Sequence, residues 1–249
     1  MKRPTVRIVL STAVALLTVG GAVTYSAVSA AGADHSAETD IWGDDLPAEL
    51  VDDPAGDLGR GRTDTPLRKM LLPVPDSHRL GPEAIPFGSN DGELDGRATT
   101  RLMKQQQQGL TGAERRRFET AVDRLGLQGM VWRTYAQDEV ADHVTEVQIV
   151  RLRNAKDAKA LFALQTGVLR ALKVAKGPVV GGHKSAICFK GATSGPGTEN
   201  DLVVYACYAY RSDTVVSVEF NGSRELYPSV VAGFVKKQLD HIASPGEYV

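Results

Sequence analysis

Hydrophobic positions recur with the period of an α-helix in three stretches of the chain. The first, 111–125, opens with Thr-Gly-Ala-Glu in the form of a capping box and is followed by Gly126, a common stop signal. The second, 155–173, follows a potential cap at Asn154, and the third begins near Pro228. The predicted buried faces are Phe118, Ala121, Val122 and Leu125, then Leu161, Leu164, Val168 and Leu172, then Val231, Val235, Leu239 and Ile242.

Apolar runs with the character of strands lie between these helices. In one of them, 143–152, the alternation changes phase after Ile149, which predicts a bulge or a strand covered on both faces. Short connections favour antiparallel pairing, and helices must cover the apolar sheet. The pattern therefore predicts an α+β domain with an antiparallel sheet of about five or six strands covered by helices. The predicted strands lie within 129–136, 143–152, 179–189, 202–210 and 216–220.

The first 33 residues have the pattern of an export segment. Lys2, Arg3 and Arg7 precede an uncharged run, 8–33, which ends in Ala-Gly-Ala, a small-x-small pattern that signal peptidases cut. The run is also long enough to span a bilayer, which takes about 20 apolar residues. We therefore expect a signal peptide or, if it stays uncleaved, a membrane anchor. Either places the rest of the chain outside the cytoplasm, because positive charge stays on the cytoplasmic side.

Residues 34–68 are predicted to form an acidic flexible linker. Within them, 34–65 carry ten acidic and two basic residues with few apolar side chains. Such a segment repels itself and buries too little apolar surface to offset the entropy of ordering it. We expect a solvated tether, with binding of a partner or a cation as the alternative. The globular domain is predicted over 69–249, and its entrance, within 66–97, is predicted to be irregular.

The balance of charge beyond the linker is a weak guide to partners. Residues 66–249 carry 24 basic and 20 acidic residues, a net charge of +4. This excess could favour an anionic cell-envelope polymer, or could attract the chain's own acidic linker. An exported chain without an aromatic and basic platform is a poor candidate for binding nucleic acid. An envelope polymer or another envelope protein remains the expected class of partner.

Cys188 and Cys207 are the only cysteines of the chain. In an oxidising compartment, two such residues predict one disulfide. They lie in strand-like runs on either side of a glycine-rich loop, 191–200, and folding back at this loop would bring the runs side by side. A metal site would need more ligands with suitable spacing, and two free buried thiols are the alternative.

Two polar groupings are weak candidates for a ligand site. Asp138, Asp142 and His143 fall in the turn between two predicted strands, where clustered carboxylates and a histidine could bind a hard cation. A solvated hairpin turn explains them equally well. His183 and Lys184 follow two glycines and could meet an anion, whereas a bulged strand entrance is the plainer interpretation.

The common catalytic and cofactor motifs are absent from the sequence. There is no phosphate-binding Gly-x-x-x-x-Gly-Lys-Ser/Thr loop, no Gly-x-Ser-x-Gly elbow and no His-Glu-x-x-His pair. The sequence therefore identifies no catalytic residue, no cofactor and no metal ligand set.

The chain resembles exported proteins of high-GC Gram-positive bacteria in its export segment, acidic tether and small α+β domain. The run Val144–Leu172, the stretch Val179–Gly182 and the two cysteines are similar to extracytoplasmic sensor-like domains and related lipoproteins. The similarity covers about 110–243 and implies a sandwich of antiparallel sheet and helices. The chain has neither a lipidation cysteine nor a kinase domain, and no functional residue can be carried over.

Two classes of function follow. The first is an extracytoplasmic, non-catalytic binding or sensor-like module, which the missing motifs favour. The second is a cell-envelope enzyme of hydrolase type whose site is assembled from residues distant in sequence. A deep cleft in which His183 or His143 meets a carboxylate would favour the enzyme, and an open sheet face or shallow groove would favour binding.

Overall fold

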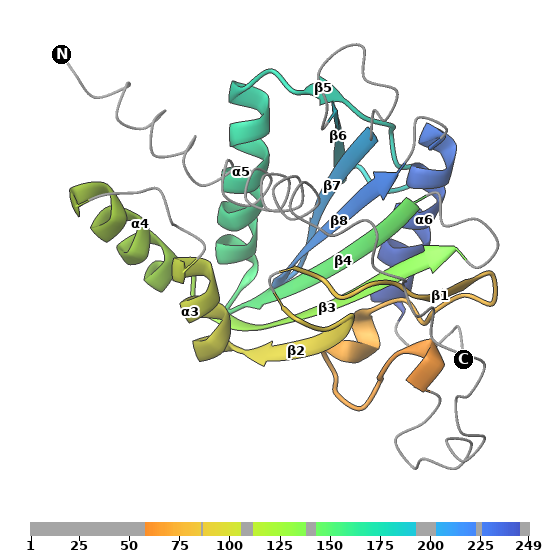
Figure 1. Cartoon of the computed structure of the whole chain (residues 1–249). Coiled ribbons are helices and arrows are strands. Elements are labelled where there is room, and N and C mark those ends of the chain that lie inside the picture. The colour runs from red at the N-terminus through yellow and green to blue at the C-terminus, as the bar shows by residue number, and fades with distance from the viewer. Residues whose placement is uncertain are drawn as a thin grey trace, which may run out of the picture.

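The structure, a computed structural model, describes residues 58–85, 87–105, 112–137, 143–192, 203–222 and 226–244. These residues form an α+β fold, as predicted (Figure 1). Its α-helices are α3 (Gly96–Gln105), α4 (Gly112–Arg124), α5 (Ala155–Ala171) and α6 (Pro228–Ala243), and two short 3₁₀ turns are η2 (Leu58–Arg60) and η3 (Arg68–Met70).

The strands form one antiparallel sheet in the order β1-β3-β4-β8-β7-β6-β5, and β2 also pairs with β3. The described residues form eight strands, compared with the predicted five or six. The additional strands are β1 and β2, which lie within the stretch expected to be irregular, and β5, which has only two residues. The strands are β1 (His78–Leu80), β2 (Asp91–Asp95), β3 (Leu127–Gln137), β4 (His143–Leu152), β5 (Ala175–Lys176), β6 (Ile187–Ala192), β7 (Val203–Arg211) and β8 (Thr214–Gly222).

Helices cover both faces of the sheet (Figure 1). Each face has its own apolar cluster. On one face, called here the α6 face, α6 packs against β3, β4, β7 and β8. On the other, the α5 face, α5 packs with side chains of α4. Successive residues of a strand point to opposite faces, so Ile149 joins the first cluster and Val150 the second.

This arrangement resolves the change of phase in β4. The strand keeps a continuous register with β8 from His143 to Arg151, so it has no bulge there. It is instead covered on both faces near its end, the second of the two predicted alternatives. The irregularity of register lies in β3, between Leu127 and Gly129.

The helix predictions hold in their main features. Gly126 adopts a φ of +61° after α4, and the Asn154 side chain accepts the Asp157 amide at 3.0 Å at the start of α5. All four residues predicted to be buried in α6 are buried. Ala121 is exposed, contrary to the prediction, and lies on the solvent side of α4.

The prediction for Leu172 is also wrong, since this side chain is 45% exposed. α5 ends at Ala171, and Lys173 then turns to a φ of 56°. The Val174 amide reaches back to the Leu169 carbonyl at 3.0 Å and closes the helix end. The chain therefore leaves the helical path where Leu172 would have continued the apolar stripe.

Residues 58–75, called here the N-terminal strap, lie on the α6 face. Leu67 and Leu71 join the apolar cluster there. The Leu72 amide donates to Gln238 Oε1 at 2.9 Å, and the Tyr135 hydroxyl donates to the Leu72 carbonyl at 2.6 Å. These buried contacts hold the strap, which overlaps the end of the predicted linker, to the α6 face.

Arg133 is the centre of the contacts to the strap and is fully buried. Its guanidinium lies 3.2 Å from the Asp91 carboxylate and donates to the carbonyls of Leu72 at 3.1 Å and Arg62 at 2.7 Å. Gly61 has a φ of +83°, and a Cβ atom there would lie 2.2 Å from Arg133 Cζ. The strap can therefore cross over this arginine only with glycine at that position.

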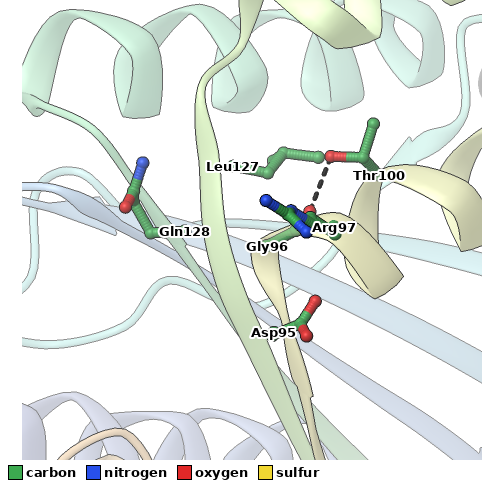
Figure 2. A pocket seen from close by; sticks show the side chains of 6 residues that line it. All are labelled: Asp95, Gly96, Arg97, Thr100, Leu127 and Gln128. Carbon is green, nitrogen blue, oxygen red and sulfur yellow. Dashed lines mark hydrogen bonds between the residues drawn. The ribbon is translucent and has the colours of Figure 1, made fainter.

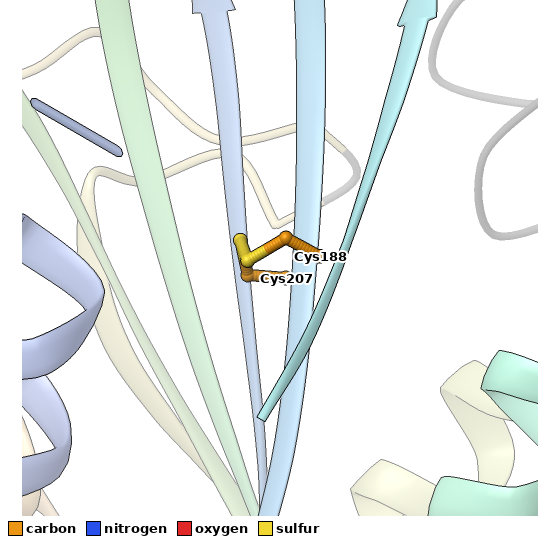
Figure 3. The surroundings of a disulfide bond; sticks show 2 residues. All are labelled: Cys188 and Cys207. Carbon is orange, nitrogen blue, oxygen red and sulfur yellow. A yellow bond between two sulfur atoms is a disulfide. The ribbon is translucent and has the colours of Figure 1, made fainter. Parts of the chain in front are cut away.

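The predicted disulfide is present between β6 and β7 (Figure 3). Cys188 and Cys207 face each other directly in the register of these strands, with their Cα atoms 4.0 Å apart. Both side chains belong to the cluster on the α6 face. The bond joins two neighbouring strands within the core.

Among the described residues, no helix is both long enough and apolar enough to cross a membrane. The predicted export segment, 1–33, and the first part of the predicted linker, 34–57, lie outside those residues.

Candidate functional site

Polar side chains gather on the α5 face of the two central strands. Glu146 of β4 is the direct partner of Glu219 of β8, and Gln148 is the partner of Ser217. Asn221 lies two residues beyond Glu219 and points to the same face. We call these five residues the acidic strip. Its first four members are partly buried, and Asn221 is exposed.

The two glutamates of the acidic strip are held by amides of their own strands. Glu146 Oε1 accepts a hydrogen bond from Gln148 Nε2 at 2.6 Å, and Glu219 Oε1 accepts one from Asn221 Nδ2 at 3.2 Å. These amides occupy one carboxylate oxygen each and orient both carboxyl groups along the sheet.

Burial changes the protonation of this pair. It raises the pKa of Glu146 to about 7, against the lowering effect of the Gln148 amide, and the charge of Glu219 adds to the rise. Burial likewise raises the pKa of Glu219. A carboxyl group with a pKa near 7 is about half protonated at neutral pH, so the strip can both donate and accept hydrogen bonds there.

Aromatic residues border the acidic strip on both sides. Tyr208 of β7 is the partner of Ser217, and burial followed by the charge of Glu219 raises the pKa of its hydroxyl. On the other side, Trp132 of β3 is the partner of Gln148, and Phe87 stacks on it with ring centroids 4.2 Å apart. The Trp132 indole donates to the Ser89 carbonyl at 3.0 Å, so this ring is fixed in place.

The structure places His183 away from the acidic strip, in the loop that precedes β6. Its Nε2 lies 2.8 Å from Asp240 Oδ1 of α6, and Lys236 binds the other oxygen of that carboxylate. The hydrogen bond from Lys236, followed by that from His183, lowers the pKa of Asp240. Among the described residues, no serine, threonine or cysteine side chain hydrogen-bonds to this histidine, so the pair ties a loop to a helix. Lys184 beside it is exposed.

The second predicted grouping is not assembled within the described residues. His143 begins β4 opposite Gly222 and is 8% exposed. Asp138 and Asp142 lie outside the described residues. No group of three or more histidine, cysteine, aspartate or glutamate side chains in the described part of the chain could hold a metal ion.

An open depression lies at the start of α3 (Figure 2). It measures about 630 Å³ and is lined by Asp95, Gly96, Arg97, Thr100, Leu127 and Gln128. Asp95 Oδ1 accepts the Ala98 amide at 2.7 Å, and the Thr100 hydroxyl donates to the Gly96 carbonyl at 2.7 Å. The first contact caps the start of α3, and the second is a side-chain bond within the helix. Neither His183 nor His143 lines the depression.

Sequence reasoning missed the acidic strip. Glu146 and Glu219 fall within two of the predicted strands, 143–152 and 216–220, but neither was identified as a site residue. The sequence shows a glutamate in each of two predicted strands. That these two glutamates face each other follows only once β4 is known to pair with β8.

Comparison with known proteins shows a distant structural likeness. No family model matches the chain, and no curated protein matches it. The extracellular domain of PknH from Mycobacterium tuberculosis is similar with a TM-score of 0.38 and 12% sequence identity, over 74% of this chain and 98% of that one. A TM-score at this level is too low to assign a fold or a function.

Proposed function

We propose that this chain is an extracytoplasmic, non-catalytic binding or sensor-like module whose ligand contacts the acidic strip. The observation that carries the proposal is the facing pair Glu146 and Glu219 on the two central strands. Like charges directly opposite each other destabilise a sheet, and partly buried carboxyl groups lose hydration. Side chains that cost stability at an accessible place are characteristic of functional sites.

The chemistry of the strip selects a class of ligand. Two carboxyl groups, two side-chain amides and a serine hydroxyl offer mostly acceptors, with amide donors between them. A ligand bearing an amine or guanidinium would place a positive charge between the two glutamates. It would also lower their raised pKa values, because an opposite charge favours the ionised form.

Two independent features support the proposed location outside the cytoplasm. The N-terminal 33 residues have the pattern of an export segment, and the disulfide between Cys188 and Cys207 is typical of proteins in oxidising compartments.

Calorimetric titration with spermidine and with free arginine tests the proposed ligand class. We expect heat of binding with the native chain at pH 7 and a loss of at least about tenfold in affinity in the Glu146→Gln/Glu219→Gln variant. Glu83→Gln, on an exposed loop, is the matched control and should bind as the native chain does. Equal binding by the double variant, or no binding of either cation, contradicts the proposal.

The same pair of carboxyl groups also favours a second candidate, a cell-envelope hydrolase. Glycoside hydrolases use two carboxyl groups, one with a raised pKa as the acid and one ionised. The test is turnover of chromogenic glycosides between pH 5 and 8. Turnover that disappears in Glu146→Gln would replace the binding module with an enzyme.

A further inference from the structure

The helices α3 and α4 carry a concentration of positive charge that the rest of the domain lacks. Residues 96–124 contain seven basic and three acidic residues, a net charge of +4, which equals the net charge of the whole stretch 66–249. On α3, three basic side chains recur at spacings of four and three and therefore share one side of the helix: Arg97, Arg101 and Lys104.

The basic side chains of these helices are available to a partner. The six arginines are exposed, and no ion pair among the described residues involves them. They are Arg97, Arg101, Arg115, Arg116, Arg117 and Arg124. Lys104 alone is paired, with Asp123 at 2.6 Å, and this contact places the basic side of α3 next to α4. We call this surface the basic hairpin.

The basic hairpin lies at one corner of the fold, where β2 ends (Figure 1). Of the described side chains of α4, Phe118 and Val122 are buried in the cluster of the α5 face. The exposed residues of α4 and the exposed side of α3, which carries Arg97 and Arg101, face solvent and leave room for a segment to lie along them.

A strongly acidic segment precedes the strap, which meets β2 at the end opposite to this corner. Residues 34–57 carry nine acidic residues and no lysine or arginine. The described chain resumes at Leu58, and the Arg62 amide donates to Asp91 at the first residue of β2 at 2.7 Å. The five residues of β2 then cover about 17 Å to the start of α3. An extended segment of this length reaches roughly 80 Å, so it can lie along both helices.

We propose that residues 34–57 dock on the basic hairpin of the same chain. In the docked state, nine carboxylates of the segment lie against six arginines and a lysine of the basic hairpin. Because the segment and this surface belong to the same chain, the effective concentration of the segment at the surface is in about the millimolar range. Docking would shorten the tether between the export segment and the domain. The proposal is independent of the acidic strip, which lies on the central strands.

Photo-crosslinking within the full-length chain in an uncharged detergent tests this docking. A benzoylphenylalanine replaces Trp42, in the middle of the acidic segment, and mass spectrometry locates the crosslinks. We expect most crosslinks within 96–124 at 0.1 M NaCl and their loss at 1 M, where the Debye length falls from about 10 to about 3 Å. The variant Arg115→Gln/Arg116→Gln/Arg117→Gln should lower the crosslink yield roughly threefold to tenfold.

The matched control removes three exposed basic side chains from α5, in the variant Lys156→Gln/Lys159→Gln/Arg170→Gln, and should leave the crosslinks unchanged. Crosslinks spread over the surface, or insensitive to salt and to the α4 arginines, overturn the proposal. Retention of the chain on an anionic polysaccharide that depends on those arginines, without crosslinks to them, overturns it too, since the surface then serves an external anion.

Discussion

The two faces of the sheet treat polar side chains in opposite ways. On the α6 face, Arg133 is fully buried, and Asp91 and backbone carbonyls satisfy its guanidinium. On the α5 face, Glu146 and Glu219 are partly buried, face each other with like charge and have raised pKa values. The first arrangement holds the chain together, whereas the second costs stability and leaves acceptors open to a ligand.

The largest expected loss in the free energy of unfolding comes from a substitution on the α6 face. Arg133→Met leaves the Asp91 carboxylate buried without its cation and the Arg62 carbonyl without the guanidinium donor, so the free energy of unfolding should fall by about 4 kcal/mol. Urea denaturation measures the change. Arg151→Met, which removes an exposed ion pair with Asp213, should cost less than about 1 kcal/mol. Similar losses in both variants would show that the strap contacts do not stabilise the fold.

The disulfide is the second test of the α6 face. The double change Cys188→Ala/Cys207→Ala reopens a loop with a sequence separation of 19 residues. The lost constraint on the unfolded chain should lower the free energy of unfolding by about 3 kcal/mol. The urea midpoint with and without reductant gives the same comparison in the native chain, and an unchanged midpoint would contradict the expectation.

On the α5 face we expect the substitution Glu146→Gln to stabilise the folded chain. Because the pKa of Glu146 is raised to about 7 in the folded chain from 4.5, folding retains a proton there, and stability falls as the pH rises through this range. Glu146→Gln removes that loss, so at pH 8 the variant should be more stable by about 2 kcal/mol, allowing for partial exposure.

The pH dependence supplies the control for this variant. At pH 4.5 the native glutamate keeps its proton in the folded chain, and the difference between the two proteins should nearly vanish. Urea denaturation at both pH values measures it, with Glu83→Gln as the exposed control. A variant that is less stable than the native chain at pH 8 would mean that the Glu146 carboxylate stabilises the fold. That result would contradict the proposed difference between the two faces.

The smallest expected effect concerns the helix that covers the α5 face. Asn154→Ala removes the side-chain acceptor for the Asp157 amide and should cost about 1 kcal/mol. Thermal unfolding measures it. Asn90→Ala is the reference variant. It removes a side-chain amide that donates to the Gly81 carbonyl at 3.2 Å, at a place that is not a helix end.

Hydrophobic periodicity predicted an element best where only one face of that element is buried. The buried stripe of α6 follows from helical periodicity alone. β2 escaped prediction because its sequence, Asp-Gly-Glu-Leu-Asp, has no strand pattern. It is a strand because β3 offers an edge and because Asp91 meets Arg133 across it. Because Arg133 is far from Asp91 in the sequence, no local sequence pattern identifies it as the partner.

The sequence by itself determined the α+β class, the three long helices, the central strands and the pairing of Cys188 with Cys207. These depend on spacing along the chain or on the only two thiols present. The tertiary structure alone decided that Glu146 faces Glu219, that Arg133 holds the strap and that His183 meets Asp240. Each of these contacts joins elements that are far apart in the sequence, and only the register and packing of the folded sheet bring such side chains within reach of one another.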